Sequence, residues 1–231
     1  MINNYNDFVT ELLAAGFSVA GGGNDEGVYG LIKHGWNEEV PDSQVRWHTG
    51  DPETDPWEWR IRVLNERDDI AYAKIFFKKG GFITKKWYPY FLAARRGQIA
   101  FVEEYEDGKI SNFAKRIYEI VSEHDCLALH DIKQLGGFKR EDKAKFDNAL
   151  TELQMKMHLT ICGSRQKTSN QGEGYGWSST VLCTTEKFWD ANIFERASTI
   201  SKIEATEKIT EQILALNPDA QPKKIKKFIS G

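Results

Sequence analysis

The chain has 231 residues, with 31 basic and 34 acidic side chains and a formal net charge of −3. This balance argues against a general nucleic-acid coat protein, which would be strongly basic, but it leaves room for a local basic patch. The length suits one large domain or two small ones. No run of about eighteen apolar residues is present, so we expect no membrane-spanning helix and no membrane partner.

Residues 1–4 have neither the basic nor the apolar part of a signal peptide. The three cysteines, Cys126, Cys162 and Cys183, are odd in number, widely spaced and set in apolar runs. This usage predicts a reduced, cytoplasmic protein with buried thiols.

The N-terminal region is predicted to begin with an amphipathic helix over residues 6–15 that Gly16 ends. Residues 36–60 are then rich in Trp, Pro, Asp and Glu. We interpret this segment as an ordered loop packed on the core, because it is too aromatic for a solvated linker. It leads into a helix with Pro56 in its first turn.

Trp57 and Arg60 are three residues apart and would share one face of that helix. Packing is the role that we expect for Trp57, and cation–π contact or base stacking is the alternative. Carboxylates also crowd the segment, at positions 51, 53, 55 and 58. We expect a solvated acidic loop there, with acid–base chemistry as the alternative.

A β-hairpin is predicted next, with strands at 70–77 and 82–83 and a turn at 78–81. Thr84 is the expected N-cap of a helix that continues to Arg96. Arg95 and Arg96 then lie in its last turn, where they complement the helix dipole, and phosphate binding is the alternative role.

An acidic turn at 103–108 is the predicted domain boundary. After it, Ser111 caps a helix over 112–123, and a short strand at 126–129, a helix to Leu135 and a turn at 136–138 follow. A helical stripe over 143–157, a strand at 159–163, a polar tip at 164–176 and a strand at 180–183 complete the order of a winged helix-turn-helix.

The predicted fold is therefore α+β, with three regions. Residues 1–110 form a Trp-rich helical and hairpin region, residues 111–185 the winged helix, and residues 186–231 a helical tail. The tail ends with four lysines in eight residues. We expect a docking helix that buries Ile225, Phe228 and Ile229, with nucleic-acid contact as the alternative.

A winged helix that reads DNA would present its second helix to the duplex. Asn148 on the outer face could pair with adenine, whereas Asp147 and Glu152 would repel phosphates. The basic residues lie on the flanks. The candidate DNA-binding residues are Lys139, Arg140, Lys143, Lys145, Asn148, Arg165, Lys167 and Trp177, and the secondary candidate surface is Trp57, Arg60, Arg95 and Arg96.

Metal and cofactor motifs are absent from the sequence. The five histidines form no H-x-x-x-H pattern and the cysteines form no C-x-x-C pair, so we expect no metal site and no cofactor.

Several stretches resemble the AlkZ-related proteins, short relatives of the AlkZ-like winged-helix DNA glycosylases. The resemblance rests on residues 55–59, 72–74 and 82–83 and on the two stretches 146–154 and 159–163, and it covers roughly residues 30–185. It implies winged-helix units and a link to DNA. The catalytic motif of the glycosylases is a glutamine two residues before Asp or Gln, whereas here Gln44 precedes Arg46 and Gln98 precedes Ala100. No catalytic residue is carried over.

Three hypotheses follow. The first is weak or sequence-independent binding of double-stranded DNA by a winged-helix protein without a clear catalytic site. The second is a divergent glycosylase-type enzyme that excises bases with the Trp-rich acidic loop. The third is a winged helix that binds a protein partner. The sequence does not determine the oligomeric state.

Overall fold

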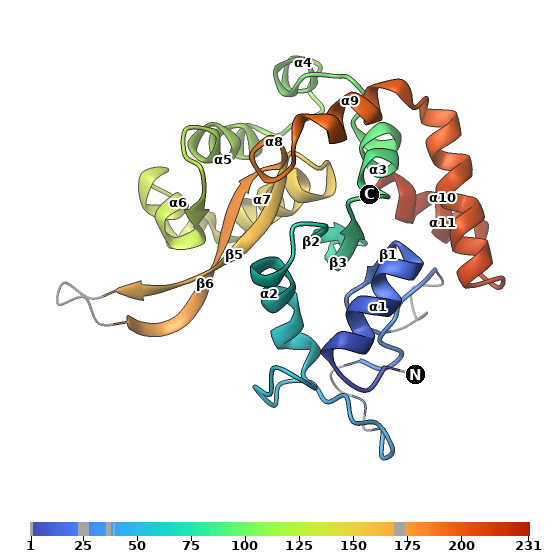
Figure 1. Cartoon of the computed structure of the whole chain (residues 1–231). Coiled ribbons are helices and arrows are strands. Elements are labelled where there is room, and N and C mark those ends of the chain that lie inside the picture. Colours follow the sequence, from blue (N-terminus) through green and yellow to red (C-terminus); the bar gives the residue numbers. More distant parts are fainter. Residues whose placement is uncertain (1, 23–27, 36–37, 39, 169–173) are drawn as a thin grey trace. The chain divides into compact units, whose positions relative to one another are not determined.

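The computed structural model describes residues 2–22, 28–35, 38, 40–168 and 174–231. The chain folds into two compact units, of which unit 1 is Met1–Gln98 with Asn192–Gly231 and unit 2 is Ile99–Ala191. Both units combine helices with antiparallel strands, so the predicted α+β class is confirmed (Figure 1). The division into three regions stays a prediction.

Unit 1 contains three antiparallel strands in the order β1, β3, β2, together with six helices in its described part. Phe17 of β1 and Ala71 of β2 both pair with Ile83 of β3. The elements are α1 (Tyr5–Ala15), β1 (Phe17–Val19), α2 (Pro56–Glu66), β2 (Ile70–Phe76), β3 (Lys79–Thr84), α3 (Tyr88–Arg95), α9 (Ala191–Thr199, whose first residue belongs to unit 2), α10 (Lys202–Leu216) and α11 (Pro222–Ser230).

Helix α1 confirms the first predicted helix, starting one residue earlier. The side chain of Asn4 accepts a hydrogen bond from the backbone N–H of Asp7 and so caps the helix. Gly16 ends it with a φ of 93°. Glycine fits there because it adopts the left-handed conformation, and because a Cβ would lie 2.1 Å from the Trp87 ring.

The hairpin between β2 and β3 turns earlier than the glycines suggested, so the predicted turn at 78–81 is wrong. Phe77 and Lys78 form the turn, with φ values of 53° and 63°. Gly80 and Gly81 belong to β3 instead, where an added Cβ would lie 2.5 Å from the Tyr72 hydroxyl and 2.3 Å from the Phe76 ring. These glycines therefore serve close packing rather than the turn.

Thr84 does not cap a helix, which corrects a second prediction. It ends β3, where it pairs with Ile70 and its N–H donates to the carbonyl of Gly16. Helix α3 begins only at Tyr88, because this start puts Pro89 in the first turn, where proline removes no helical hydrogen bond.

Helix α11 docks on unit 1 through its apolar face, as predicted for the tail. Ile225, Phe228 and Ile229 are buried. The Phe228 ring stacks on Phe76 of β2 with a centroid distance of 3.8 Å. The lysines of the helix therefore lie on its remaining surface.

Arg95 holds the end of this helix in place. Its guanidinium donates to the carbonyls of Phe228 at 2.7 Å, Ile229 at 2.8 Å and Ile75 at 2.8 Å. Burial lowers the pKa of the guanidinium to about 9, which still leaves it charged at neutral pH. A cation on the last carbonyls of a helix stabilises both the carbonyls and the helix dipole.

Unit 2 contains three antiparallel strands in the order β5, β6, β4, so the short first strand pairs with the last one. Leu127 of β4 pairs with Leu182 of β6. The elements are α4 (Phe101–Glu106), α5 (Asn112–Ser122), β4 (Leu127–Ala128), α6 (Leu129–Leu135), the 3-10 helix η1 (Arg140–Asp142), α7 (Lys143–Met155), β5 (Leu159–Thr168), β6 (Gly174–Thr184) and α8 (Thr185–Phe188).

Two predictions need correction in unit 2. The acidic stretch at 103–108 is mostly helix α4 rather than a turn. The strands β5 and β6 extend far into the predicted tip at 164–176, and their outer parts reach beyond α5 and α6 (Figure 1). Ser111, in contrast, caps α5 as predicted, by accepting from the N–H of Ala114.

A buried hydrogen bond between a carboxylate and a histidine fixes α4 within unit 2. Glu104 is 5 % exposed and His158 fully buried, and His158 Nε2 lies 2.7 Å from Glu104 Oε2. Burial raises the pKa of Glu104, but the hydrogen bond from His158 and the ammonium of Lys156 outweigh it, so the net pKa is lowered from 4.5. The carboxylate is thus charged in the folded protein.

We expect Arg95→Met to lower the free energy of unfolding by about 2–3 kcal/mol, because three carbonyls lose a charged donor. Urea unfolding followed by circular dichroism measures this. The exposed Arg46→Met should stay within about 0.5 kcal/mol of the wild type. Equal losses in the two variants would contradict the role of Arg95.

The Glu104 pair predicts acid sensitivity. A carboxylate whose pKa is lowered by folding stabilises the protein above its unfolded pKa, near 4.5, and this contribution is lost as the pH falls through the folded pKa. Glu104→Gln should therefore flatten the fall in unfolding free energy below pH 4.5. The exposed Glu207→Gln is the control and should keep the wild-type pH curve. A curve for Glu104→Gln parallel to that of the wild type would refute this.

Candidate nucleic-acid interface

The start of α7 carries a cluster of exposed cations, which we call the α7 flank: Lys139, Arg140, Lys143 and Lys145. The 3-10 helix η1 places them, because the Asp142 carboxylate accepts from the backbone N–H of Lys139 at 3.0 Å. In the part of the chain that the structure describes, none of the four side chains forms an ion pair. The sequence predicted these residues, and the fold gathers them at one helix start.

The middle of α7 is less suited to reading bases. Asn148 is exposed, as its predicted role requires, but exposed Asp147 lies next to it. Glu152 is engaged elsewhere, since its carboxylate accepts from the Ser111 N–H at 3.0 Å and the Ser111 hydroxyl at 2.7 Å. The carboxylate of Glu152 therefore stabilises the start of α5. Of the two acidic residues, only Asp147 would then face DNA bound to α7.

The candidate residues on β5 differ in their surroundings. Arg165 is half-exposed and pairs with Asp131 of α6, whereas Lys167 is exposed. Trp177 belongs to β6, but its side chain lies outside the described residues. Arg165 thus ties the hairpin to α6, and Lys167 is the cation of this strand that faces solvent.

Lys133 of α6 is a cation that the sequence did not single out. Its ammonium lies 4.9 Å from the centre of the Phe146 ring on α7. It therefore adds a positive charge beside the same helix. Its position depends on the packing of α6 against α7, which spacing alone does not show.

The secondary surface in unit 1 centres on Trp57, which is 44 % exposed. The Arg60 guanidinium lies 3.3 Å from the Trp57 ring centre, and its Nε donates to the Trp57 carbonyl at 2.7 Å. The ring of His48 lies on Trp57 as well, at 4.8 Å between centroids. The ring of Trp57 therefore makes the cation–π contact that was the alternative to core packing, and a base-stacking role stays a prediction.

Asp55 builds this surface. It is fully buried, and its carboxylate accepts from the N–H groups of Trp57 at 2.8 Å, His48 at 3.0 Å and Gly50 at 2.9 Å. His48 has a φ of 60°, an uncommon conformation for a residue other than glycine. The Asp55 carboxylate thus caps α2 and holds the loop before it.

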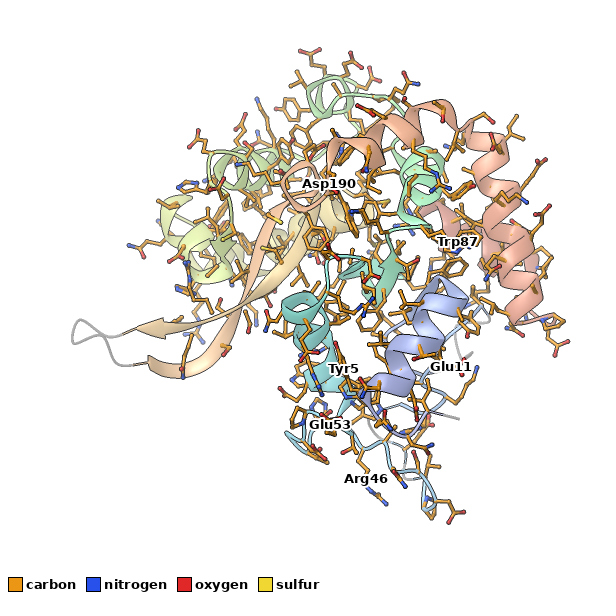
Figure 2. All side chains as sticks on the ribbon, in the orientation of Figure 1. Tyr5, Glu11, Arg46, Glu53, Trp87 and Asp190 are labelled. Carbon is orange, nitrogen blue, oxygen red and sulfur yellow. The ribbon has the colours of Figure 1, made fainter. Side chains whose placement is uncertain are left out.

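The same loop is tied to α1 and α2 near their ends. The Tyr5 N–H donates to the Glu53 carbonyl at 2.9 Å, and the two residues lie close together in Figure 2. The Glu53 carboxylate pairs with Arg62 of α2 at 2.7 Å, and that guanidinium lies 3.9 Å from the Tyr5 ring centre. Arg46 of this loop is exposed (Figure 2). The predicted ordered loop is therefore confirmed for its described residues, and Trp36 lies outside them.

Arg95 and Arg96, the other members of the secondary surface, have different environments from Trp57. The Arg95 guanidinium is committed to three backbone carbonyls, and Arg96 is half-buried at the end of α3. Phosphate binding by this pair stays a prediction, and the contacts of Arg95 give it a structural role already.

Cys162 and Cys183 lie on the paired strands β5 and β6 and Cys126 directly precedes β4, but the three cysteines are not all buried as predicted. Cys126 is exposed, Cys162 half-buried and Cys183 buried. The thiol of Cys183 hydrogen-bonds Cys162 and lowers its pKa. Among the described residues, no group of three His, Cys, Asp or Glu side chains is placed to hold a metal ion. No described helix is long and apolar enough to cross a membrane.

The geometry defines an α+β protein that presents a helix flank of exposed cations and an exposed tryptophan in contact with an arginine. The family model described as AlkZ related matches residues 2–230, so the chain belongs to the AlkZ-related family. The match is wider than the predicted span of residues 30–185. No curated protein and no solved structure matches the chain.

The contacts of Asp55 predict that Asp55→Asn lowers the free energy of unfolding by about 2–3 kcal/mol, because an amide cannot accept from all three N–H groups. Trp57 should also become more mobile, which lowers its fluorescence anisotropy. Asp68→Asn is the control, since this exposed residue makes the same change of charge without that burial. The interpretation fails if the two variants unfold at the same urea concentration.

Proposed function

We propose that this protein binds double-stranded DNA with little sequence preference, through unit 2 folded as a winged helix-turn-helix. The observation that carries the proposal is the α7 flank, an exposed set of cations at the start of the helix that such a fold presents to DNA. Membership of the AlkZ-related family supports a DNA-related role.

The order of elements in unit 2 supports the winged-helix interpretation. Helices α5, α6 and α7 precede the long β5–β6 hairpin, and the short strand β4 between α5 and α6 pairs with β6. In this arrangement α7 is the recognition helix and the hairpin is the wing. Lys167, an exposed residue of β5, would then be a cation on the wing.

The charges explain why little sequence preference is expected. Lysine and arginine contacts to phosphates give affinity without reading sequence. Asp147 is exposed at the centre of α7 and would repel the phosphates that approach there. Asn148 is thus the main candidate for a base contact, and one amide supplies limited discrimination.

The base-excision alternative, which would use the Trp-rich loop, has less support. The buried carboxylate of this loop belongs to Asp55, and it already accepts hydrogen bonds from three backbone N–H groups. Asp51 and Glu53 are exposed, and Glu53 pairs with Arg62. Gln44 and Gln98, the glutamines nearest to the glycosylase pattern, are both exposed.

The α7 flank predicts a salt dependence that mutation can reduce. Binding of a fluorescent mixed-sequence duplex, followed by anisotropy at several salt concentrations, gives the slope of log K against log salt. The triple variant K139Q/R140Q/K143Q should lower this slope by roughly 2–3, because each phosphate contact contributes about 0.9.

The charge-matched control is K109Q/K202Q/K208Q, in which Lys109 and Lys208 already pair with Asp107 and Glu211. It should keep the wild-type slope. No binding by the wild type at low salt, or binding with no slope, would remove the proposal. Abasic sites formed in alkylated duplex DNA would favour base excision instead.

A further inference from the structure

A second group of lysines lies in unit 1, at the hairpin turn and on α11. We call it the turn–α11 patch: Lys78, Lys79, Lys223, Lys224, Lys226 and Lys227. All of these side chains are exposed except that of Lys224, which is half-buried. The sequence shows the four lysines of α11, but the two at the turn join them only in the folded chain.

The turn and the helix meet at Phe77. Its ring lies 5.9 Å from that of Phe228 on α11. The ammonium groups of Lys224 and Lys227 lie 5.7 Å and 5.6 Å from the centre of the same ring. Two cations of the helix are therefore held beside the turn that carries Lys78.

The backbone of the turn adds a second observation. Phe77 and Lys78 both have positive φ, although two-residue hairpin turns of this kind favour Asn and Gly. Such conformations are strained for residues with a bulky side chain. The contacts of Phe77 with α11 hold the strained turn, and the arrangement keeps a lysine at its tip.

The patch gathers many like charges in a short space. The turn and α11, residues 77–79 and 222–230, contain six lysines. Lys223 and Lys224 occupy the first turn of α11, where the helix dipole disfavours cations. The helix dipole therefore does not explain these two lysines, whereas attraction to an anionic ligand does.

The apolar residues of α11 distinguish between two anionic partners. A helix that binds a membrane surface inserts its apolar face between the lipids. Here Ile225, Phe228 and Ile229 are buried within unit 1, so this face is not available. A surface of lysines without an apolar face suits the phosphodiester backbone of a nucleic acid, which lysines bind as point charges.

We infer that the turn–α11 patch binds the phosphate backbone of nucleic acid as a contact surface in its own right. It shares the ligand of the proposed function but none of its residues. It also requires neither the winged-helix interpretation of unit 2 nor the α7 flank.

The test uses the full-length protein and the same mixed-sequence duplex. The variant K78Q/K226Q/K227Q changes only exposed side chains and should lower the slope of log K against log salt by roughly 2–3, while the control K109Q/K202Q/K208Q leaves it unchanged. A second variant, K78Q/K223Q/K226Q, should have the same effect. Circular dichroism melts establish that the variants fold.

The outcomes separate this inference from the proposed function. A lower slope in the α7-flank variant alone overturns the inference and leaves the proposed function. A lower slope in the patch variants alone supports the inference and overturns the α7 flank as the site. Patch variants that keep the duplex slope but lose binding to phosphatidylserine vesicles would assign the patch to a membrane surface and overturn the inference.

Discussion

The buried carboxylate of Asp55 is the constraint on which the N-terminal half of unit 1 depends. One side chain caps α2 and receives two further N–H groups from the loop that precedes it. A charged acceptor in a buried position is stable only when such donors surround it. The loop must therefore close around Asp55, and this closure places His48 and Trp57 in contact on the surface. The exposed aromatic surface is thus a consequence of a buried polar interaction.

The other buried ionisable groups follow the same logic. Arg95 collects the carbonyls at the end of α11, and Glu104 pairs with His158 in unit 2. Each of these groups is nearly saturated by partners within its own unit. A group held in this way stabilises the fold but has little freedom to exchange a proton with a substrate. The cations that remain available for a polyanionic partner are therefore the exposed lysines and arginines.

Local signals in the sequence predicted much of the fold. The cap at Ser111 was predicted because it acts within three residues of its partner, and helices α1, α2 and α5 were placed to within a residue or two at their starts. The hairpin turn was misplaced because glycine usually marks a turn, whereas Gly81 is required by the ring of Phe76 across the strands. Such a requirement depends on tertiary packing and has no local signature.

The features of the candidate site likewise divide into those that local spacing predicts and those that depend on tertiary packing. Spacing alone located the α7 flank, because its four cations lie within seven residues of one another. The Glu104–His158 pair joins residues 54 positions apart, so spacing does not reveal it, and the sequence predicted an acidic turn around Glu104. The exposure of Trp57 was likewise hidden, since tryptophan is more often buried and only the closure of the loop around Asp55 turns it outward.

The net charge of −3 and the proposed binding of a polyanion are compatible because several carboxylates are already engaged within the protein. Asp55 and Glu152 accept hydrogen bonds from backbone N–H groups, and Asp131 pairs with Arg165. The cations of the α7 flank stay exposed, although Glu141 and Asp142 lie between them in the sequence. The α7 flank and the turn–α11 patch are each small enough to contact only a few phosphates. Since affinity of this kind grows with the number of phosphates neutralised, binding through either set alone would be weak and strongly dependent on salt.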